Sequence, residues 1–294
     1  MNNKKERNVS RREFLKAAAL GVGAGVAGLD RLAFSGPSPA APVPPKMIPV
    51  GVQIYSVRGA AGKDFPGVIE AIAKLGYEGV EFAGYYGWEA KPKELRKLLD
   101  DNGLKCCGTH TGLNTITGDA LGATAEMHAA LGNPYLIVPS LVAVDEAGWL
   151  DLARKFNDIL PRAEALGMRI GYHAHAHDFK KMGEKTSWEI FFDNTDKRVL
   201  MQMDTGNCLA GGGDPVAMLK KYPGRSLTVH LKEEGGPEGA VIGQGDVPWK
   251  DVFAACETAG GTLWYIVEHE TTPNVLDGIK GSIEGLRKLG RARP

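Results

Sequence analysis

Cysteine is scarce in this 294-residue sequence, which contains only Cys106, Cys107, Cys208 and Cys256. The four residues form no CxxC pair and have no zinc-finger spacing. The sequence therefore predicts neither a disulfide framework nor a thiolate metal site. Buried free thiols are the expected state of all four.

A net charge of one sign is also missing, because 35 Lys and Arg balance 35 Asp and Glu. Residues 1–40 hold seven basic and three acidic residues, which leaves 28 basic and 32 acidic residues, a net charge of −4, for the remainder. A mildly acidic body lacks the basic surface that attracts nucleic acid or an anionic membrane. We therefore expect no nucleic-acid partner.

Long apolar runs are absent near the N-terminus, where a membrane anchor would need ~20 apolar residues. The segment Ser10-Arg11-Arg12-Glu13-Phe14-Leu15-Lys16 is followed by a moderately apolar stretch, Ala17–Ala27. This pattern resembles a twin-arginine export signal, with small residues suited to cleavage near Ala40. The alternative is a basic amphipathic first helix. The resemblance implies a transient partner, the twin-arginine translocon, and a periplasmic protein without a stable membrane anchor.

The composition divides the chain into three parts. Residues 1–40 are the predicted signal peptide, residues 41–46 a Pro-rich linker, and residues 47–294 a single folded domain. Short apolar or β-branched runs alternate with helical patterns throughout the domain. The predicted strands are Ile48–Ile54, Gly79–Phe82, Lys105–Thr109, Tyr135–Val138, Arg169–Tyr172, Val199–Met203, Ser226–Leu231 and Leu263–Glu268. The predicted helices are Phe65–Leu75, Lys93–Asn102, Gly118–Leu131, Trp149–Leu166, Ser187–Phe192, Pro215–Lys221, Trp249–Ala259 and Asn274–Leu289.

Several predicted helices end at a Gly that suits a C-cap, as at Gly76, Gly103 and Gly167. A repeat of helix, Gly and strand is typical of parallel βα units, and eight such units favour closure into a barrel. The predicted fold is thus an α/β (β/α)₈ TIM barrel, which needs about 250 residues.

Active sites of such barrels lie at the carboxyl ends of the strands. Four consecutive predicted strands end at or run through His173, Asp204, His230 and Glu268. Two imidazoles and two carboxylates suit one divalent ion, and this mixed set fits Mn²⁺, Zn²⁺, Co²⁺ or Fe²⁺ better than Ca²⁺, with Mg²⁺ also compatible. Open coordination positions would bind a pair of substrate oxygens.

The motifs in this region resemble the xylose-isomerase-like sugar isomerase/epimerase superfamily, from Val50 to about Leu289. The spacing of the four candidate ligands resembles that of ketose epimerases, in which the first ligand is usually Glu rather than His173. The matching pieces are Val50-Gly51-Val52-Gln53-Ile54-Tyr55-Ser56-Val57-Arg58, Gly79-Val80-Glu81-Phe82-Ala83-Gly84, Gly171-Tyr172-His173-Ala174-His175, Met203-Asp204-Thr205-Gly206-Asn207, Val229-His230-Leu231-Lys232, Ile242-Gly243-Gln244-Gly245-Asp246 and Ile266-Val267-Glu268.

Two positions depart from the family pattern. Ala174 replaces the Asn of a Tyr-His-Asn-His signature, and Asp178 stands where a longer Glu is usual. The family's epimerases use two Glu residues as an opposed acid/base pair, and only Glu268 matches here.

The resemblance implies deprotonation next to a keto-sugar carbonyl, with an enediolate stabilised by the metal. The candidate bases are Glu268, His175 and Asp178, and Lys232 is the candidate for stabilising negative charge or donating a proton.

Four further residues are candidates for substrate contact. Gln53 lies near the end of the first predicted strand, and Trp88 is the one Trp in a loop that a substrate is expected to reach. His110 comes directly after the third predicted strand and Glu81 lies in the second, and each either binds substrate or supports a metal ligand.

The leading interpretation is a metal-dependent isomerase or epimerase of a keto-sugar or polyol. The enzymatic alternative is a lyase, either inosose-dehydratase-like or eliminating a keto-glycoside. The non-enzymatic alternative is a sugar-binding barrel that has lost catalysis. A homo-oligomer is compatible with all three. A nuclease for abasic DNA, which the same barrel also supports, is disfavoured by the acidic body and the predicted export.

Overall fold

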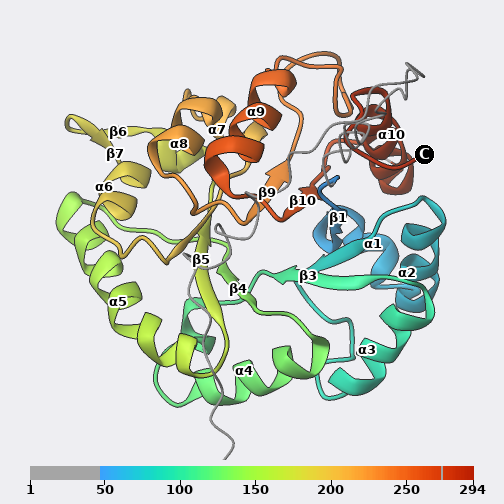
Figure 1. Cartoon of the computed structure of the whole chain (residues 1–294), viewed down its shortest axis with the longest axis horizontal. Helices are drawn as coiled ribbons and strands as arrows, with labels where there is room; N and C mark the ends of the chain where they lie inside the picture. The colour runs from blue at the N-terminus through green and yellow to red at the C-terminus, as the bar shows by residue number, and fades with distance from the viewer. Residues whose placement is uncertain (1–46, 273) are drawn as a thin grey trace, which may run out of the picture. The chain divides into compact units, whose positions relative to one another are not determined.

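The computed structural model describes residues 47–272 and 274–294. The predicted export signal and linker, residues 1–40 and 41–46, lie outside the described residues. The described residues form one compact unit, and its helices lie around a central set of strands (Figure 1). Of the helices in the described ranges, none is long and apolar enough to span a membrane.

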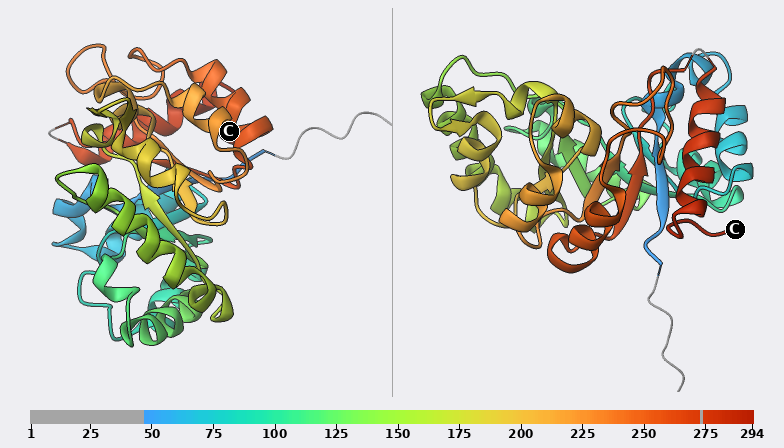
Figure 2. Two further views of the ribbon diagram at one scale, coloured as in Figure 1. Left: turned by 90° about the vertical axis from the view of Figure 1, so that its left-hand side faces the viewer. Right: turned by 90° about the horizontal axis from the view of Figure 1, so that it is seen from above.

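Eight parallel strands form the barrel wall, and each overlaps one of the eight predicted runs; β5 extends one residue beyond its run, to His173. They are β1 (Val50–Gln53), β2 (Gly79–Phe82), β3 (Lys105–Thr109), β4 (Tyr135–Val138), β5 (Arg169–His173), β8 (Leu200–Gln202), β9 (Thr228–Leu231) and β10 (Trp264–Val267). The first and last strands are neighbours, with Val50 opposite Tyr265, and Figure 2 shows blue β1 beside red β10. The TIM-barrel prediction is therefore confirmed.

Two hydrogen-bonded segments make up the wall, in the orders β3-β2-β1-β10-β9 and β4-β5-β8. Single parallel bridges join them, His110 with Ile137 on one side and Asp204 with His230 on the other. A short antiparallel hairpin, β6 (Lys181–Met182) with β7 (Lys185–Thr186), follows the β5 end and was not predicted.

Ten α-helices are described, and eight of them correspond to the predicted helical segments. They are α1 (Arg58–Ala61), α2 (Phe65–Lys74), α3 (Pro92–Asp101), α4 (Ala120–Leu131), α5 (Glu146–Ala165), α6 (Ser187–Asp193), α7 (Thr205–Ala210), α8 (Pro215–Lys221), α9 (Trp249–Ala255) and α10 (Val275–Lys288). The predicted extension of the α9 segment to Ala259 is a widened π turn, Cys256–Gly260. Gly103 (φ +69°) and Gly167 (φ +75°) lie in the left-handed region just after α3 and α5, as expected for C-terminal caps.

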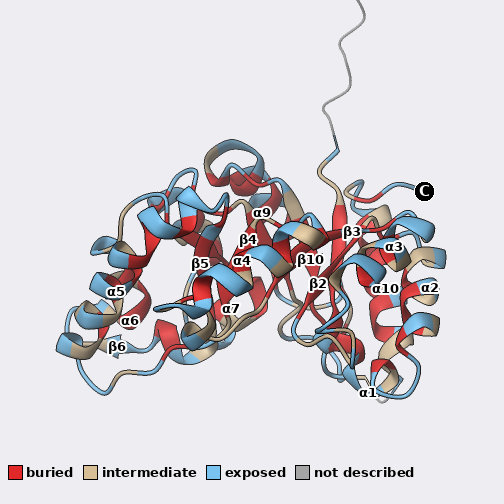
Figure 3. Cartoon of the chain, turned by 90° about the horizontal axis from the view of Figure 1, so that it is seen from below, coloured by how far each residue is buried: buried red, intermediate tan, exposed pale blue. Residues whose placement is uncertain are grey.

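Apolar side chains fill the layer between strands and helices, so the strands are buried while the outer helix faces are exposed (Figure 3). Trp149 on α5 and Trp188 on α6 are buried. Both pack against Tyr172 of β5, with ring centroids 6.2 and 5.5 Å apart. These aromatic residues join helix to barrel, and their burial against β5 fixes the strand that carries His173.

Candidate active site

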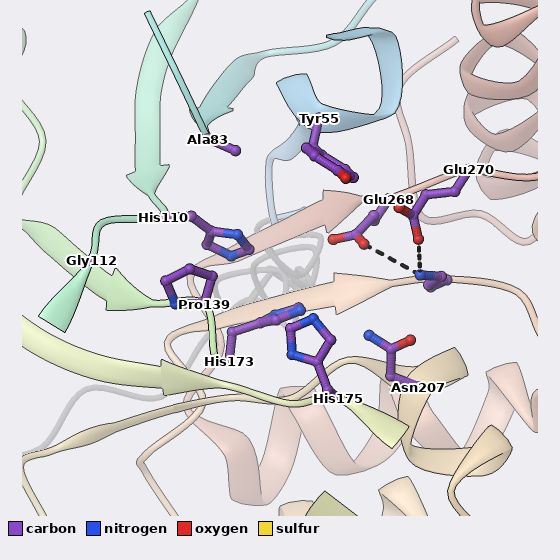
Figure 4. Close-up of a pocket in the computed structure, with 11 residues that line it drawn as sticks. Tyr55, Ala83, His110, Gly112, Pro139, His173, His175, Asn207, Glu268 and Glu270 are labelled. Carbon is purple, nitrogen blue, oxygen red and sulfur yellow. Dashed lines mark hydrogen bonds and ion pairs between the residues drawn. The ribbon is translucent and has the colours of Figure 1, made fainter. Parts of the chain in front are cut away.

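A pocket of about 530 Å³ lies at the carboxyl ends of the strands. Its lining combines three imidazoles, two carboxylates and one ammonium group, and Figure 4 shows most of these side chains pointing toward one another. The lining residues are Tyr55, Ala83, His110, Gly112, Pro139, His173, His175, Asn207, Lys232, Glu268 and Glu270. A concave site with a few converging polar groups is the usual form of a small-molecule site.

The four predicted metal ligands lie together at the base of this pocket. His173, Asp204, His230 and Glu268 each offer one ligand atom, and these atoms all lie within 4.8 Å of one another. All four side chains are buried, the most exposed being Glu268 at 7%. His173 Nδ1 and Asp204 Oδ2 are buried without a hydrogen-bond partner. Since such atoms are costly to bury unpaired, the donor set fits a divalent cation.

Local structure fixes the direction of Asp204. This residue follows β8 and caps α7, where its Oδ1 accepts the Asn207 amide at 2.7 Å. The cap uses one carboxylate oxygen and leaves Oδ2 aimed at the cluster. Burial raises the pKa of Asp204 to about 7, Glu268 adds to that rise, and Lys232 and His230 oppose it.

His230 lies between two carboxylates, one on each ring nitrogen. Its Nδ1 is 2.6 Å from Glu268 Oε2 and 3.9 Å from Asp204 Oδ2, and its Nε2 is 2.5 Å from Glu81 Oε2. Burial alone would lower the pKa of His230. The charge of Glu81 and the hydrogen bonds to both glutamates outweigh it and raise the pKa to about 10. Burial lowers the pKa of His173 well below its usual value, so that imidazole is neutral and its lone pair is available.

Lys232 and Glu270 lie at the mouth of the site. The ammonium of Lys232 is 3.3 Å from Glu268 Oε1 and forms a shorter ion pair with Glu270. Burial alone would lower the pKa of Lys232, but Asp204, Glu268 and Glu270 together raise it. Lys232 is therefore an ammonium group in the pocket, with N–H donors for a negatively charged oxygen.

His175 lines the pocket next to His173, with the ring centroids 4.9 Å apart. Burial lowers the pKa of His175 to about 4, so its imidazole is neutral, and its Nδ1 has no hydrogen-bond partner. Asp178, another predicted catalytic residue, is fully buried outside the lining and accepts hydrogen bonds from the Tyr172 hydroxyl and the His175 amide. Its position supports His175 rather than a direct role as the base.

Three predicted substrate-binding residues lie outside the pocket lining. Gln53 and Glu81 are fully buried and bond to each other at 2.8 Å. Trp88 is half-buried and packs against Phe65, with the ring centroids 6.0 Å apart. His110 alone of the four lines the pocket, and its Nε2 is 2.8 Å from Gln202 Oε1. Gln53, Glu81 and Trp88 thus do not line this pocket, and their contact with substrate stays a prediction.

Sequence reasoning missed several residues that the structure places in or under the site. Tyr55, Asn207 and Glu270 line the pocket, and Gln202 lies beneath it between Glu81 and His110. Gln202 occupies a strand position two residues before Asp204. The alternation of side chains along a strand puts both on the same face, which is the signal that would have identified it.

Comparisons with known proteins agree with this architecture. The chain is similar to inosose dehydratase of Clostridium tetani, with 31% identity over 150 residues, 44% of this chain and 49% of that protein. It is also similar to inosose dehydratase of Histophilus somni, with 23% identity over 269 residues, 75% of this chain and 87% of that protein. The matches to the first few curated relatives span between about half and two thirds of their length.

A solved structure described as a sugar phosphate isomerase/epimerase from Parabacteroides distasonis superposes with a TM-score of 0.73. It is 25% identical, and the superposition covers 84% of this chain and all of that one. A family model described as "Xylose isomerase-like TIM barrel" matches residues 69–289, most of the described barrel. The chain belongs to the xylose isomerase-like TIM barrel family.

Proposed function

We propose that this protein is a divalent-metal-dependent lyase that deprotonates a keto-sugar or keto-polyol next to its carbonyl and eliminates the β-substituent. The observation that carries the proposal is the unequal pair of proton-transfer groups in the pocket. His175 is a neutral imidazole at the end of β5, and Lys232 is an ammonium group at the end of β9. Glu268 and Glu270 both follow β10, and no other carboxylate lines the described pocket.

An elimination needs one base and one acid, and the two need not be alike. His175 takes the proton from the carbon next to the carbonyl. Lys232 protonates the departing oxygen as the β C–O bond breaks, so the products are an unsaturated ketone and water or an alcohol. Solvent then restores both side chains. A divalent ion held by the buried His/Asp/Glu cluster supplies Lewis acidity that stabilises negative charge on substrate oxygens.

The similarity to proteins named inosose dehydratase supports loss of water from a cyclic keto-polyol. Isomerisation or epimerisation is the second candidate, and the likeness to a sugar phosphate isomerase/epimerase favours it. The two reactions share the deprotonation step. They differ in whether the carbon is then reprotonated or the substituent on the adjacent carbon is eliminated. The arrangement of Asp178 argues against a reaction that needs two opposed carboxylates.

Proton NMR in D₂O separates the candidates. The metal-loaded protein is incubated with inososes, 3-keto-glycosides and ketohexoses. An olefinic signal with a conjugated-ketone absorbance supports the lyase, whereas deuterium in an otherwise intact sugar supports the epimerase. Sugar binding without either product would contradict both and favour a non-catalytic barrel. His175→Gln should abolish turnover, and the matched change His177→Gln, at a neighbouring histidine outside the pocket lining, should not.

We also propose that residues 1–40 direct export through the twin-arginine translocon to the periplasm. The support is the sequence Arg11-Arg12 followed by Phe14-Leu15-Lys16. Changing Arg11 and Arg12 together to Lys should retain the precursor in the cytoplasmic fraction, and changing Lys4 and Lys5 to Gln should not. Equal export of both variants would reject this route.

A further inference from the structure

Glu81 reaches its position through an irregularity in the barrel wall. Along β2 and β3, Val80 is opposite Cys106, but Glu81 is opposite Gly108, so Cys107 is an extra residue in β3. Such bulges re-aim side chains next to active sites. Gly108 provides the space, because a Cβ atom there would lie 2.2 Å from Glu81 Oε1. The bulge and the glycine together let a full-length glutamate lie inside the wall.

The Glu81 carboxylate accepts hydrogen bonds from three sides. Gln53 Nε2 and His230 Nε2 reach Oε2 at 2.8 and 2.5 Å, and Gln202 Nε2 reaches Oε1 at 2.8 Å. The orientation of the Gln202 amide is set on its other side, where its Oε1 lies 2.8 Å from His110 Nε2. A carboxylate accepts hydrogen bonds at both oxygens. A Gln side chain at position 81 would instead place its own NH₂ group against at least one of these N–H donors.

We propose that Glu81 is a positioning residue for the metal site: by accepting the Nε2–H of His230, it holds this ring so that Nδ1 faces Asp204 and Glu268. The inference rests on the metal site of the proposed function. Glu81 is fully buried and does not line the pocket, so it acts through His230 rather than on substrate. Carboxylates behind metal-binding histidines fix the tautomer and the orientation of the ring in this way.

Zinc binding without substrate tests this role. The metal-stripped full chain is titrated with Zn²⁺ in competition with a chromogenic chelator, for the wild type and for Glu81→Gln. We expect Zn²⁺ affinity to fall by roughly 10- to 100-fold in the variant. Glu78→Gln is the matched control, because Glu78 precedes the same strand at its other end and pairs with Arg293 at 3.2 Å. This control should bind Zn²⁺ like the wild type.

A second measurement on the wild type keeps the proposal testable if Glu81→Gln does not fold. Long-range ¹H–¹⁵N NMR of the Zn²⁺-loaded protein should show the metal-shifted nitrogen of His230 to be Nδ1 and a proton on Nε2. Metal ligation through Nε2, or unchanged Zn²⁺ affinity in folded Glu81→Gln, would overturn the proposal. Both readouts use the metal alone, so they stand apart from any failure to find a keto-sugar substrate.

Discussion

Asp178 holds His175 through the backbone: its Oδ2 accepts the His175 amide at 2.8 Å, while its Oδ1 accepts the Tyr172 hydroxyl at 2.7 Å. Tyr172 in turn is packed among the aromatic rings of α5 and α6. The direction of the chain at His175 is therefore set from the buried layer behind β5. The short side chain at position 178 suits this bond across three residues, as in a helix cap.

The Asp178 carboxyl should make stability fall as pH rises from about 4 to 6. Burial raises the pKa of Asp178 to about 6, while an unfolded chain has a pKa of about 3.9. Between these values the folded state binds more protons, so the free energy of unfolding decreases with pH, by up to about 3 kcal/mol. Urea unfolding of the wild type and Asp178→Asn across this range measures the effect. A difference between the two proteins that stays constant from pH 4 to 6 would contradict it.

Metal binding should release protons in a pH-dependent number. The pKa of His230 is raised to about 10 and that of Asp204 to about 7 in the metal-free arrangement, and a ligand must lose its proton to bind. Zn²⁺ should therefore displace about two protons below pH 7 and about one between pH 7 and 10. Affinity then rises with pH. Calorimetry in buffers of different ionisation enthalpy, at pH 6 and pH 8, counts the protons, and the same count at both would refute the assignment.

Asp204→Asn should remove metal binding without removing the helix cap. Asn caps helices about as well as Asp, but it lacks the negative charge that the cluster directs at a cation. Zn²⁺ affinity should fall by at least about 100-fold, with little change in the unfolding midpoint of the metal-free protein. Asp214→Asn is the control, because Asp214 caps α8 through Val216 and Ala217 at 2.9 and 3.0 Å. Equal metal content in both variants would show that Asp204 is not a metal ligand.

Lys232→Met should lower kcat while the metal stays bound. Loss of a general acid typically costs about 10² to 10⁴ in rate, and Met keeps most of the apolar length of the side chain. Rates on the substrate identified by NMR, with metal content by mass spectrometry, separate the two effects. Lys221→Met, at an exposed lysine paired with Glu189, is the control. Wild-type turnover in Lys232→Met would exclude Lys232 as the acid.

Much of the fold follows from patterns along the chain. The bounds of β2, β3 and β4 are those predicted, because each strand closely follows a helix that ends at a left-handed Gly, namely Gly76, Gly103 or Gly132. Helix α7 was missed, since six residues containing Gly206 offer no apolar repeat. The Asp204 side chain caps the start of this helix. The turn that allows this cap leaves no periodic pattern of apolar residues in the sequence.

The candidate site could be predicted in part, from the residues at the ends of the predicted strands. Strand ends locate His173 and Asp204 at one face of a barrel. The position of Glu81 depends on the Cys107 bulge, and that of Asp178 on a bond to a neighbouring backbone amide. Both are consequences of three-dimensional pairing, so sequence alone left Glu81 open between substrate and ligand support.

The two seams of the barrel wall carry residues of the site. In the described part of the chain, His110 with Ile137 and Asp204 with His230 are the pairs that join its two sheet segments. The amides of Thr111 and His230 donate across these seams, each at 2.8 Å. An ion bound by His173 and Asp204 of one segment and by His230 and Glu268 of the other would thus hold the two halves of the wall against each other. Slower hydrogen exchange at the Thr111 and His230 amides would then indicate that the pocket is occupied.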